Sequence, residues 1–174
     1  MVELGCWPGS WLQVLAQRVG PRGRVVGVDL QALDPLEGPV VLLELDFTDP
    51  DACSQLAGAL GRPADAVFCD AAPKLSGIRD VDRAALEELY DAALRVCGEV
   101  LRPGGSFVLK GFPGPGSDRF RVILRQRFGR VAELRPEGKR STSKEFYWVA
   151  SGEPGEKAKP SRRPRRGRPR GKRA

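Results

Sequence analysis

Residues 1–29, MVELGCWPGSWLQVLAQRVGPRGRVVGVD, decide the fold. Short apolar runs at about 1–5 and 24–29 predict two buried strands, and the pattern at about 10–19 between them predicts a helix. A helix that joins two short buried strands is the usual crossover between parallel strands. The segment therefore predicts a strand–helix–strand unit of an α/β protein.

The same alternation continues along the chain. Further Val-rich runs predict strands at about 40–45, 65–70 and 105–111, and helices at about 50–60, 82–101 and 117–128. Two last strands, near 130–135 and 145–151, flank a polar loop and resemble an antiparallel hairpin. We predict a Rossmann-like, mostly parallel, doubly wound sheet in one domain, residues 1–152, with its ligand across the carboxyl ends of the strands.

Composition narrows the chemistry. The 174 residues contain four cysteines, none in a CxxC pair, and no histidine, so we expect free thiols and no metal site. Without histidine, proton transfer falls to Lys, Asp, Glu, Tyr or Cys. There is no apolar stretch long enough for a membrane helix and no leader pattern, so we expect a cytoplasmic, monomeric protein without membrane contacts.

The basic charge is concentrated at the C-terminus. Residues 153–174 hold ten Lys and Arg against two Glu, a balance of +8 within a net charge of +7, so the rest of the chain carries −1. The segment has no aromatic or branched aliphatic residue, which predicts a disordered tail. It is either a solvated solubility tail or an arm that binds RNA by releasing counterions, and we favour the RNA arm.

Glycines and acids follow the first three predicted strands. Gly5 and Gly9 lie in the first turn, where backbone would pass close to a ligand, but the spacing is not GxGxxG, which weakens a dinucleotide interpretation. Asp29 is placed to bind the ribose hydroxyls of a nucleoside cofactor, and Asp46 its adenine amino group. Each acid alone is equally explained as a helix cap.

Charged residues also end the next two strands. Asp70 follows Val67-Phe68-Cys69, and Lys110 interrupts Ser106–Phe112, so each places a charge at the end of a buried run. The two form either a structural salt bridge or part of a site beside the cofactor, and we favour the site. Glu145 begins the last apolar run and, considered alone, fits a surface position equally well.

Six motifs in this order and spacing, ELGCWPGSW, VGVDL, ELDF, CDAAP, PGGSFVLKGF and SKEFYWVASG, resemble the FtsJ/RrmJ ribose 2′-O-methyltransferases across nearly all of residues 1–152. The resemblance implies S-adenosyl-L-methionine as cofactor and RNA as substrate, most often large-subunit ribosomal RNA or the ribosomal subunit. It implies cofactor contacts by Gly9, Trp11, Asp29, Asp46 and Asp70, with Gly5 in the same turn. It also makes Asp70, Lys110 and Glu145 three members of the family's Lys-Asp-Lys-Glu catalytic set.

The sequence departs from the family pattern in two places. Glu3 stands where the family usually has Asp, and Gly9-Ser10 where it usually has two glycines. The family's first catalytic Lys lies on a helix before the first strand, and no residue here is assigned to that role. We therefore expect either a start upstream of Met1 or a shortened form, and we keep two alternatives, an impaired RNA-binding protein and a nicotinamide-dependent oxidoreductase.

Overall fold

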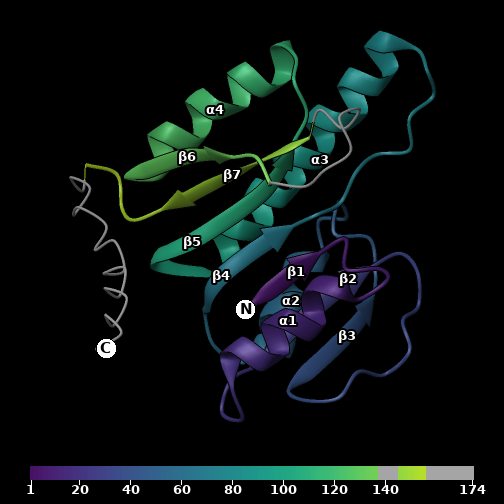
Figure 1. The fold of residues 1–174 in the computed structure, drawn as a ribbon, viewed down its shortest axis with the longest axis vertical. Coiled ribbons are helices and arrows are strands. Elements are labelled where there is room, and N and C mark those ends of the chain that lie inside the picture. The colour runs from purple at the N-terminus through teal and green to yellow at the C-terminus, as the bar shows by residue number, and fades with distance from the viewer. Residues whose placement is uncertain (137–144, 156–174) are drawn as a thin grey trace, which may run out of the picture.

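A seven-stranded sheet organises the molecule, and the computed structural model describes residues 1–136 and 145–155 of it. The strand order is β3-β2-β1-β4-β5-β7-β6, and only β7 runs antiparallel to its neighbours (Figure 1). The strands are β1 Val2–Leu4, β2 Val25–Asp29, β3 Val40–Glu44, β4 Ala64–Cys69, β5 Leu101–Gly111, β6 Arg130–Leu134 and β7 Phe146–Ser151. The predicted α/β sheet with its antiparallel C-terminal pair is confirmed.

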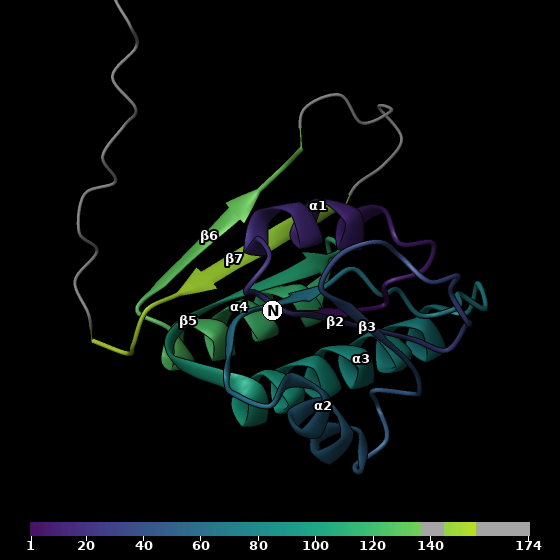
Figure 2. The same cartoon turned by 90° about the horizontal axis from the view of Figure 1, so that it is seen from below.

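Four described helices lie on the two faces of this sheet. They are α1 Ser10–Val19, α2 Ala52–Leu60, α3 Arg79–Val100 and α4 Pro115–Arg127. Figure 2 shows α1 on one face and the other three on the opposite face. The larger core lies under α2, α3 and α4, where Leu56, Tyr90, Phe107 and Trp148 are almost fully buried. None of the described helices is long and apolar enough to span a membrane.

The order of the strands creates a switch point at β1. From β1 the chain moves outward through β2 and β3, then returns to place β4 on the other side of β1 and continues to β5. Helices that follow β1 and β4 therefore leave in opposite directions, and a crevice opens between them at the carboxyl ends of the strands. We call this edge of the sheet the carboxyl edge, and it carries the residues described below.

The third helix differs from its expected bounds at both ends. It begins at Arg79, ahead of the expected 82, because the Asp82 carboxylate accepts hydrogen bonds from Ser76 N–H, Ser76 Oγ and Gly77 N–H and so fixes the entry into the helix. It ends at Val100, and β5 follows without a loop. Residues 102–105, which follow the expected end of this helix, lie within the bounds of β5 as a bulge between the pairs Ala64–Leu101 and Ala66–Ser106.

Candidate active site

Asp70, Lys110 and Tyr147 meet at the carboxyl edge and form what we call the Asp70 cluster. Asp70 follows the last residue of β4, Lys110 lies next to the end of β5, and β7 pairs Tyr147 directly with Lys110. Lys110 Nζ is 3.1 Å from Asp70 Oδ1 and donates to the Asp70 carbonyl oxygen at 2.6 Å. Tyr147 Oη donates to Asp70 Oδ1 at 2.7 Å.

This cluster is sheltered but open on one side. The side chains of Lys110 and Asp70 are 13% and 26% exposed, and Asp70 Oδ2 has no partner among the described residues. Burial, followed by the hydrogen bond and charge of Asp70, raises the pKa of Tyr147, so its hydroxyl stays protonated and donates. One carboxylate oxygen thus fixes the Lys110 ammonium and the Tyr147 hydroxyl, and the other remains available to a ligand.

Tyr147 is the member of this cluster that sequence reasoning missed. Its place among Phe146, Trp148 and Val149 indicates core, and the side chain is indeed buried, at 7% exposed. The pattern that could have indicated its role is the alternation of side chains along β7. That alternation puts Tyr147 on the same face of the sheet as Lys110, with which it is paired.

Trp11 borders the cluster from the first turn of α1. Its ring lies 5.4 Å from that of Tyr147 and 5.9 Å from that of Phe68. These contacts place the indole beside the Asp70 cluster, at the side of the site that faces β4 and β7. Trp148, by contrast, is 2% exposed and belongs to the core.

Asp29 ends β2 and joins it to the turn after β1. Its Oδ2 accepts a hydrogen bond from Trp7 N–H at 2.9 Å, and its Oδ1 accepts one from Gln31 N–H at 3.0 Å. A carboxylate offers about four lone-pair positions, so two remain for further donors. Asp29 therefore shapes the turn and can still accept hydrogen bonds from ribose hydroxyls.

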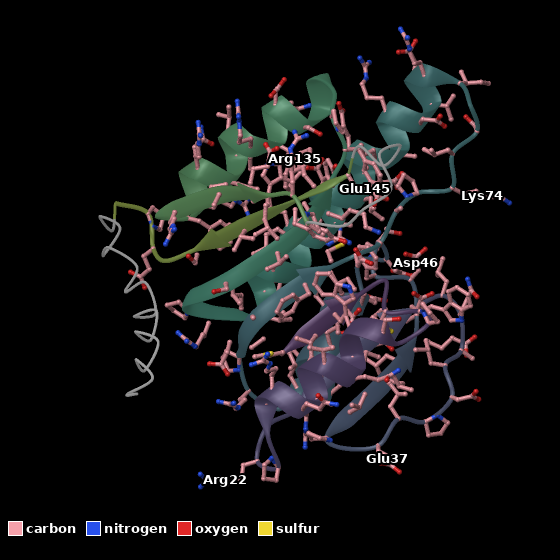
Figure 3. The ribbon with its side chains drawn as sticks, in the orientation of Figure 1. Arg22, Glu37, Asp46, Lys74, Arg135 and Glu145 are labelled. Atoms are coloured by element: carbon pink, nitrogen blue, oxygen red, sulfur yellow. The ribbon has the colours of Figure 1, made fainter. Side chains whose placement is uncertain are left out.

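Asp46, just beyond β3, is exposed and also serves a local turn. Its Oδ1 accepts hydrogen bonds from Thr48 N–H at 2.8 Å and Thr48 Oγ1 at 2.6 Å. Oδ2 has no partner among the described residues. Figure 3 shows Asp46 and Glu145 at the same edge of the molecule, with Arg22 at the opposite end.

The backbone of the protein itself explains why both of these positions in the first turn are occupied by glycine. Gly5 has φ +74°, and a Cβ there would lie 2.6 Å from the Cα of Ala71, which follows β4. Gly9 has φ +99° and is the N-cap of α1. Both conformations are rarely adopted by other residues. The turns after β1 and β4 are thereby packed together beside the switch point.

Glu3 is a further acid in this region, and in the sequence it stands out only as a departure from a family pattern. It lies in the middle of β1, is 2% exposed, and its Oε2 has no hydrogen-bond partner among the described residues. Burial, with the charges of Asp70 and Asp29, raises the pKa of Glu3 to about 8. The position of this acid between two apolar residues of a short predicted strand is the pattern that indicates a buried carboxyl group.

Glu145 lies directly before β7 and lines a cavity of about 770 Å³ at the same edge. The cavity is bounded by the segment after Asp70, the first turns of α3 and the segment between β5 and α4. The structure therefore brings Glu145 to the edge that carries Asp70 and Lys110, on the side away from Asp29 and Asp46.

The carboxyl groups along this edge suit a cationic ligand. Asp29 ends β2, Asp46 follows β3 and Asp70 follows β4, and Lys110 is paired with Asp70. S-adenosylmethionine carries a sulfonium and an ammonium against one carboxylate, and its ribose and adenine groups supply hydrogen-bond donors. The residues present therefore fit this cofactor in charge and in donor–acceptor chemistry.

Two solved structures that share this fold are described as methyltransferases. A chain described as a ribosomal RNA methyltransferase from Plasmodium falciparum aligns with a TM-score of 0.76 at 23% identity, covering 89% of this chain and 86% of that one. Human Methyltransferase-like protein 13 in complex with SAH aligns with a TM-score of 0.62 at 17% identity, covering 91% and 74%. The fold and the site define the class of S-adenosylmethionine-dependent methyltransferases with a Rossmann-like sheet.

Sequence relatives narrow the class to a family. The family model for FtsJ-like methyltransferase matches residues 1–153, and the chain belongs to that family. A protein named Ribosomal RNA large subunit methyltransferase E from Methanothrix thermoacetophila is 45% identical over 149 residues, which are 86% of this chain and 57% of that protein. The protein of the same name from Halorhodospira halophila is 42% identical over 153 residues, covering 87% and 72%. Family membership sets aside the nicotinamide-dependent alternative.

Proposed function

We propose that the protein transfers a methyl group from S-adenosylmethionine to a ribose 2′-hydroxyl of large-subunit ribosomal RNA. The observation that carries the proposal is the Asp70 cluster, in which a sheltered lysine is fixed by a carboxylate at the switch point of an FtsJ-like sheet. The names of the relatives support the choice of RNA.

In this proposal the cofactor lies along the first part of the carboxyl edge. Asp29 and Asp46 use their remaining acceptor positions for the ribose and adenine groups, and Gly5 and Gly9 keep the turn after β1 free of side chains. Trp11 and Asp70 border the reactive end. The cofactor supplies a methyl group that its sulfonium has already activated, so the protein is left with alignment and with the proton of the hydroxyl.

The Asp70 cluster performs those two tasks. A ribose hydroxyl is a poor nucleophile near neutral pH and gains from a positioned partner for its proton. Lys110 Nζ, held between the carboxylate and the carbonyl oxygen of Asp70, orients the hydroxyl as an ammonium donor and accepts its proton when it is present as the neutral amine. Asp70 and Glu145 orient Lys110 and the incoming ribose, and the Tyr147 hydroxyl keeps the Asp70 carboxylate in place.

RNA would also contact the basic tail. The tail begins at Glu153, and residues 156–174 lie outside the described part of the chain. Its composition supports an electrostatic arm that adds affinity without sequence preference. We propose that the protein acts as a monomer in the cytoplasm, where ribosomal RNA is the abundant substrate.

The proposal is tested by methyl transfer from labelled S-adenosylmethionine to in vitro transcribed large-subunit ribosomal RNA, followed by nucleoside analysis. We expect 2′-O-methylated product from the wild type and a loss of about 10²- to 10⁴-fold in the Lys110→Ala variant. Arg22→Gln, a change at the opposite end of the molecule, is the control. A wild type that binds cofactor and RNA but transfers no label would instead support the RNA-binding alternative.

A further inference from the structure

The cavity lined by Glu145 is large enough for a ligand of its own. Its volume is about 770 Å³, within the range of ~300–1,000 Å³ typical of small-molecule sites. We call it the α3–α4 cavity because the first turns of those two helices form its sides. It lies at the carboxyl edge, beyond the Asp70 cluster as seen from Asp29 and Asp46.

The chain connects this cavity directly to the Asp70 cluster. Pro73, in one wall, follows Asp70 by three residues, and Phe112, in the opposite wall, follows Lys110 by two. A ligand in the cavity therefore lies against the two segments that directly follow Asp70 and Lys110.

The lining combines an apolar surface with a charged margin. Leu75, Leu86 and Phe112 supply the apolar surface, and the charged side chains of the lining are Arg79, Asp80, Asp82, Arg83, Glu87 and Glu145. Leu75 itself is 70% exposed, and Ile78 and Val81, which follow it in the chain, are 62% and 53% exposed. Exposed apolar residues in such a group mark a binding surface more often than chance exposure.

Arg79 places a positive charge at a position where it does not stabilise its own helix. It is in the first turn of α3, where the helix dipole disfavours a cation, and among the described residues it makes no ion pair. Arg83, one turn later, is only loosely paired, 3.8 Å from Asp80 and 4.0 Å from Glu87. A guanidinium without an ion pair at the margin of the cavity can bind a phosphate group.

Hydrogen bonds hold both walls in place. The segment with Leu75 is fixed to α3 through Ser76 and Asp82, as described above. On the other side Phe112 N–H donates to Tyr90 Oη at 3.2 Å, and Ser117 Oγ donates to the Phe112 carbonyl oxygen. The cavity is therefore built into the fold and does not require a ligand to form it.

We propose that the α3–α4 cavity binds the base of the RNA nucleotide that receives the methyl group. Phe112 and Leu75 pack against the base, and Arg79 binds a neighbouring phosphate. RNA-binding proteins commonly read unpaired bases by stacking them on aromatic side chains. The inference rests on the proposed function and specifies which part of the site takes the RNA.

Steady-state methylation of in vitro transcribed large-subunit ribosomal RNA tests this assignment. Phe112→Ala raises KM for RNA by roughly 5- to 150-fold, the range for loss of one base–aromatic stack, and leaves KM for S-adenosylmethionine unchanged. Leu75→Ala and Arg79→Gln raise KM for RNA several-fold. Phe112→Leu keeps apolar volume without the ring and separates loss of stacking from loss of folding, which melting temperatures also check.

Matched controls lie outside the cavity. Val122→Ala removes an apolar side chain on α4 that is 54% exposed, and Arg22→Gln removes an exposed charge at the far end. Both should leave KM for RNA unchanged. If folded Phe112, Leu75 and Arg79 variants also keep the wild-type KM, the cavity assignment is wrong while the proposed function stands. If the wild type methylates no RNA, both fail together.

Discussion

Tyr147 and Lys110 bind the same oxygen atom of Asp70, from directly paired positions of two strands. The Tyr147 hydroxyl is 2.7 Å and the Lys110 ammonium 3.1 Å from Asp70 Oδ1. Because β5 and β7 pair these residues in register, the sheet itself sets the spacing of the two donors. The position of Lys110 therefore depends on the antiparallel strand β7 as well as on its own strand, β5.

Replacing Tyr147 with Phe removes the donor and keeps the ring that packs against Trp11. Loss of a hydrogen bond to a charged group costs about 1.5–3 kcal/mol, so we expect kcat to fall by roughly 10- to 100-fold. KM for S-adenosylmethionine should not change. An unchanged kcat in a correctly folded variant would make Tyr147 a core residue only.

Asp70 and Lys110 should behave as one unit in a double-mutant cycle. We expect Asp70→Asn and Lys110→Ala each to reduce kcat by at least ~10²-fold, and the double variant to be hardly worse than Lys110→Ala alone. The reason is that Asp70 acts largely through the lysine it holds. Additive losses would show that the two residues act independently.

Glu3 should make the stability of the free protein fall as pH rises. Burial raises its pKa from the ordinary 4.5 to about 8, so between these values the folded protein keeps a proton that the unfolded chain has released. Each pH unit in that window then lowers the free energy of unfolding by up to about 1.4 kcal/mol. Below pH 4.5 and above pH 8 this contribution is constant.

The Glu3→Gln variant keeps a neutral side chain of similar shape and removes this dependence. Denaturant unfolding of the wild type and the variant at pH 5, 6, 7 and 8 measures the effect. We expect the difference between them to shift in favour of the variant with each step. Parallel curves would indicate that Glu3 ionises normally in the folded state.

Deleting residues 153–174 tests the tail separately from the site. Removal of its basic residues should weaken RNA binding and flatten the dependence of affinity on salt, with a slope change of about 0.7–0.9 for each phosphate that the tail would otherwise neutralise. S-adenosylmethionine affinity should remain the same, since the described cofactor-side residues lie elsewhere. The measurement is the RNA affinity of both proteins at several salt concentrations from low to moderate. An unchanged slope of affinity against salt would indicate that the tail contributes to solubility and does not bind RNA.

Much of this architecture was predictable because strands buried on both faces leave a clear pattern. The run Val25–Asp29 indicates both a central strand and the acid at its end, and each predicted element corresponds to an observed one. The junction of α3 and β5 was less accessible, because a Pro-Gly-Gly segment indicates a loop in sequence and forms a bulge only when β4 pairs across it.

The site was predictable only where it follows strand ends. Asp70 and Lys110 end neighbouring buried runs, so their approach could be expected. The roles of Tyr147 and Glu3 depend on strand register and on burial, which no local pattern reports. The α3–α4 cavity depends on segments far apart in the chain, and its existence required the folded arrangement.

The close approach of Gly5 to Ala71 links two separate motifs in their evolution. A Cβ on residue 5 would fall 2.6 Å from the Cα of residue 71, so residue 5 cannot carry a side chain unless the backbone after β4 moves. One of these turns borders the cofactor side and the other leads from Asp70 to the cavity. Descendants of this sequence should therefore keep Gly at position 5 for as long as these two turns keep their present spacing, whichever residue follows Asp70.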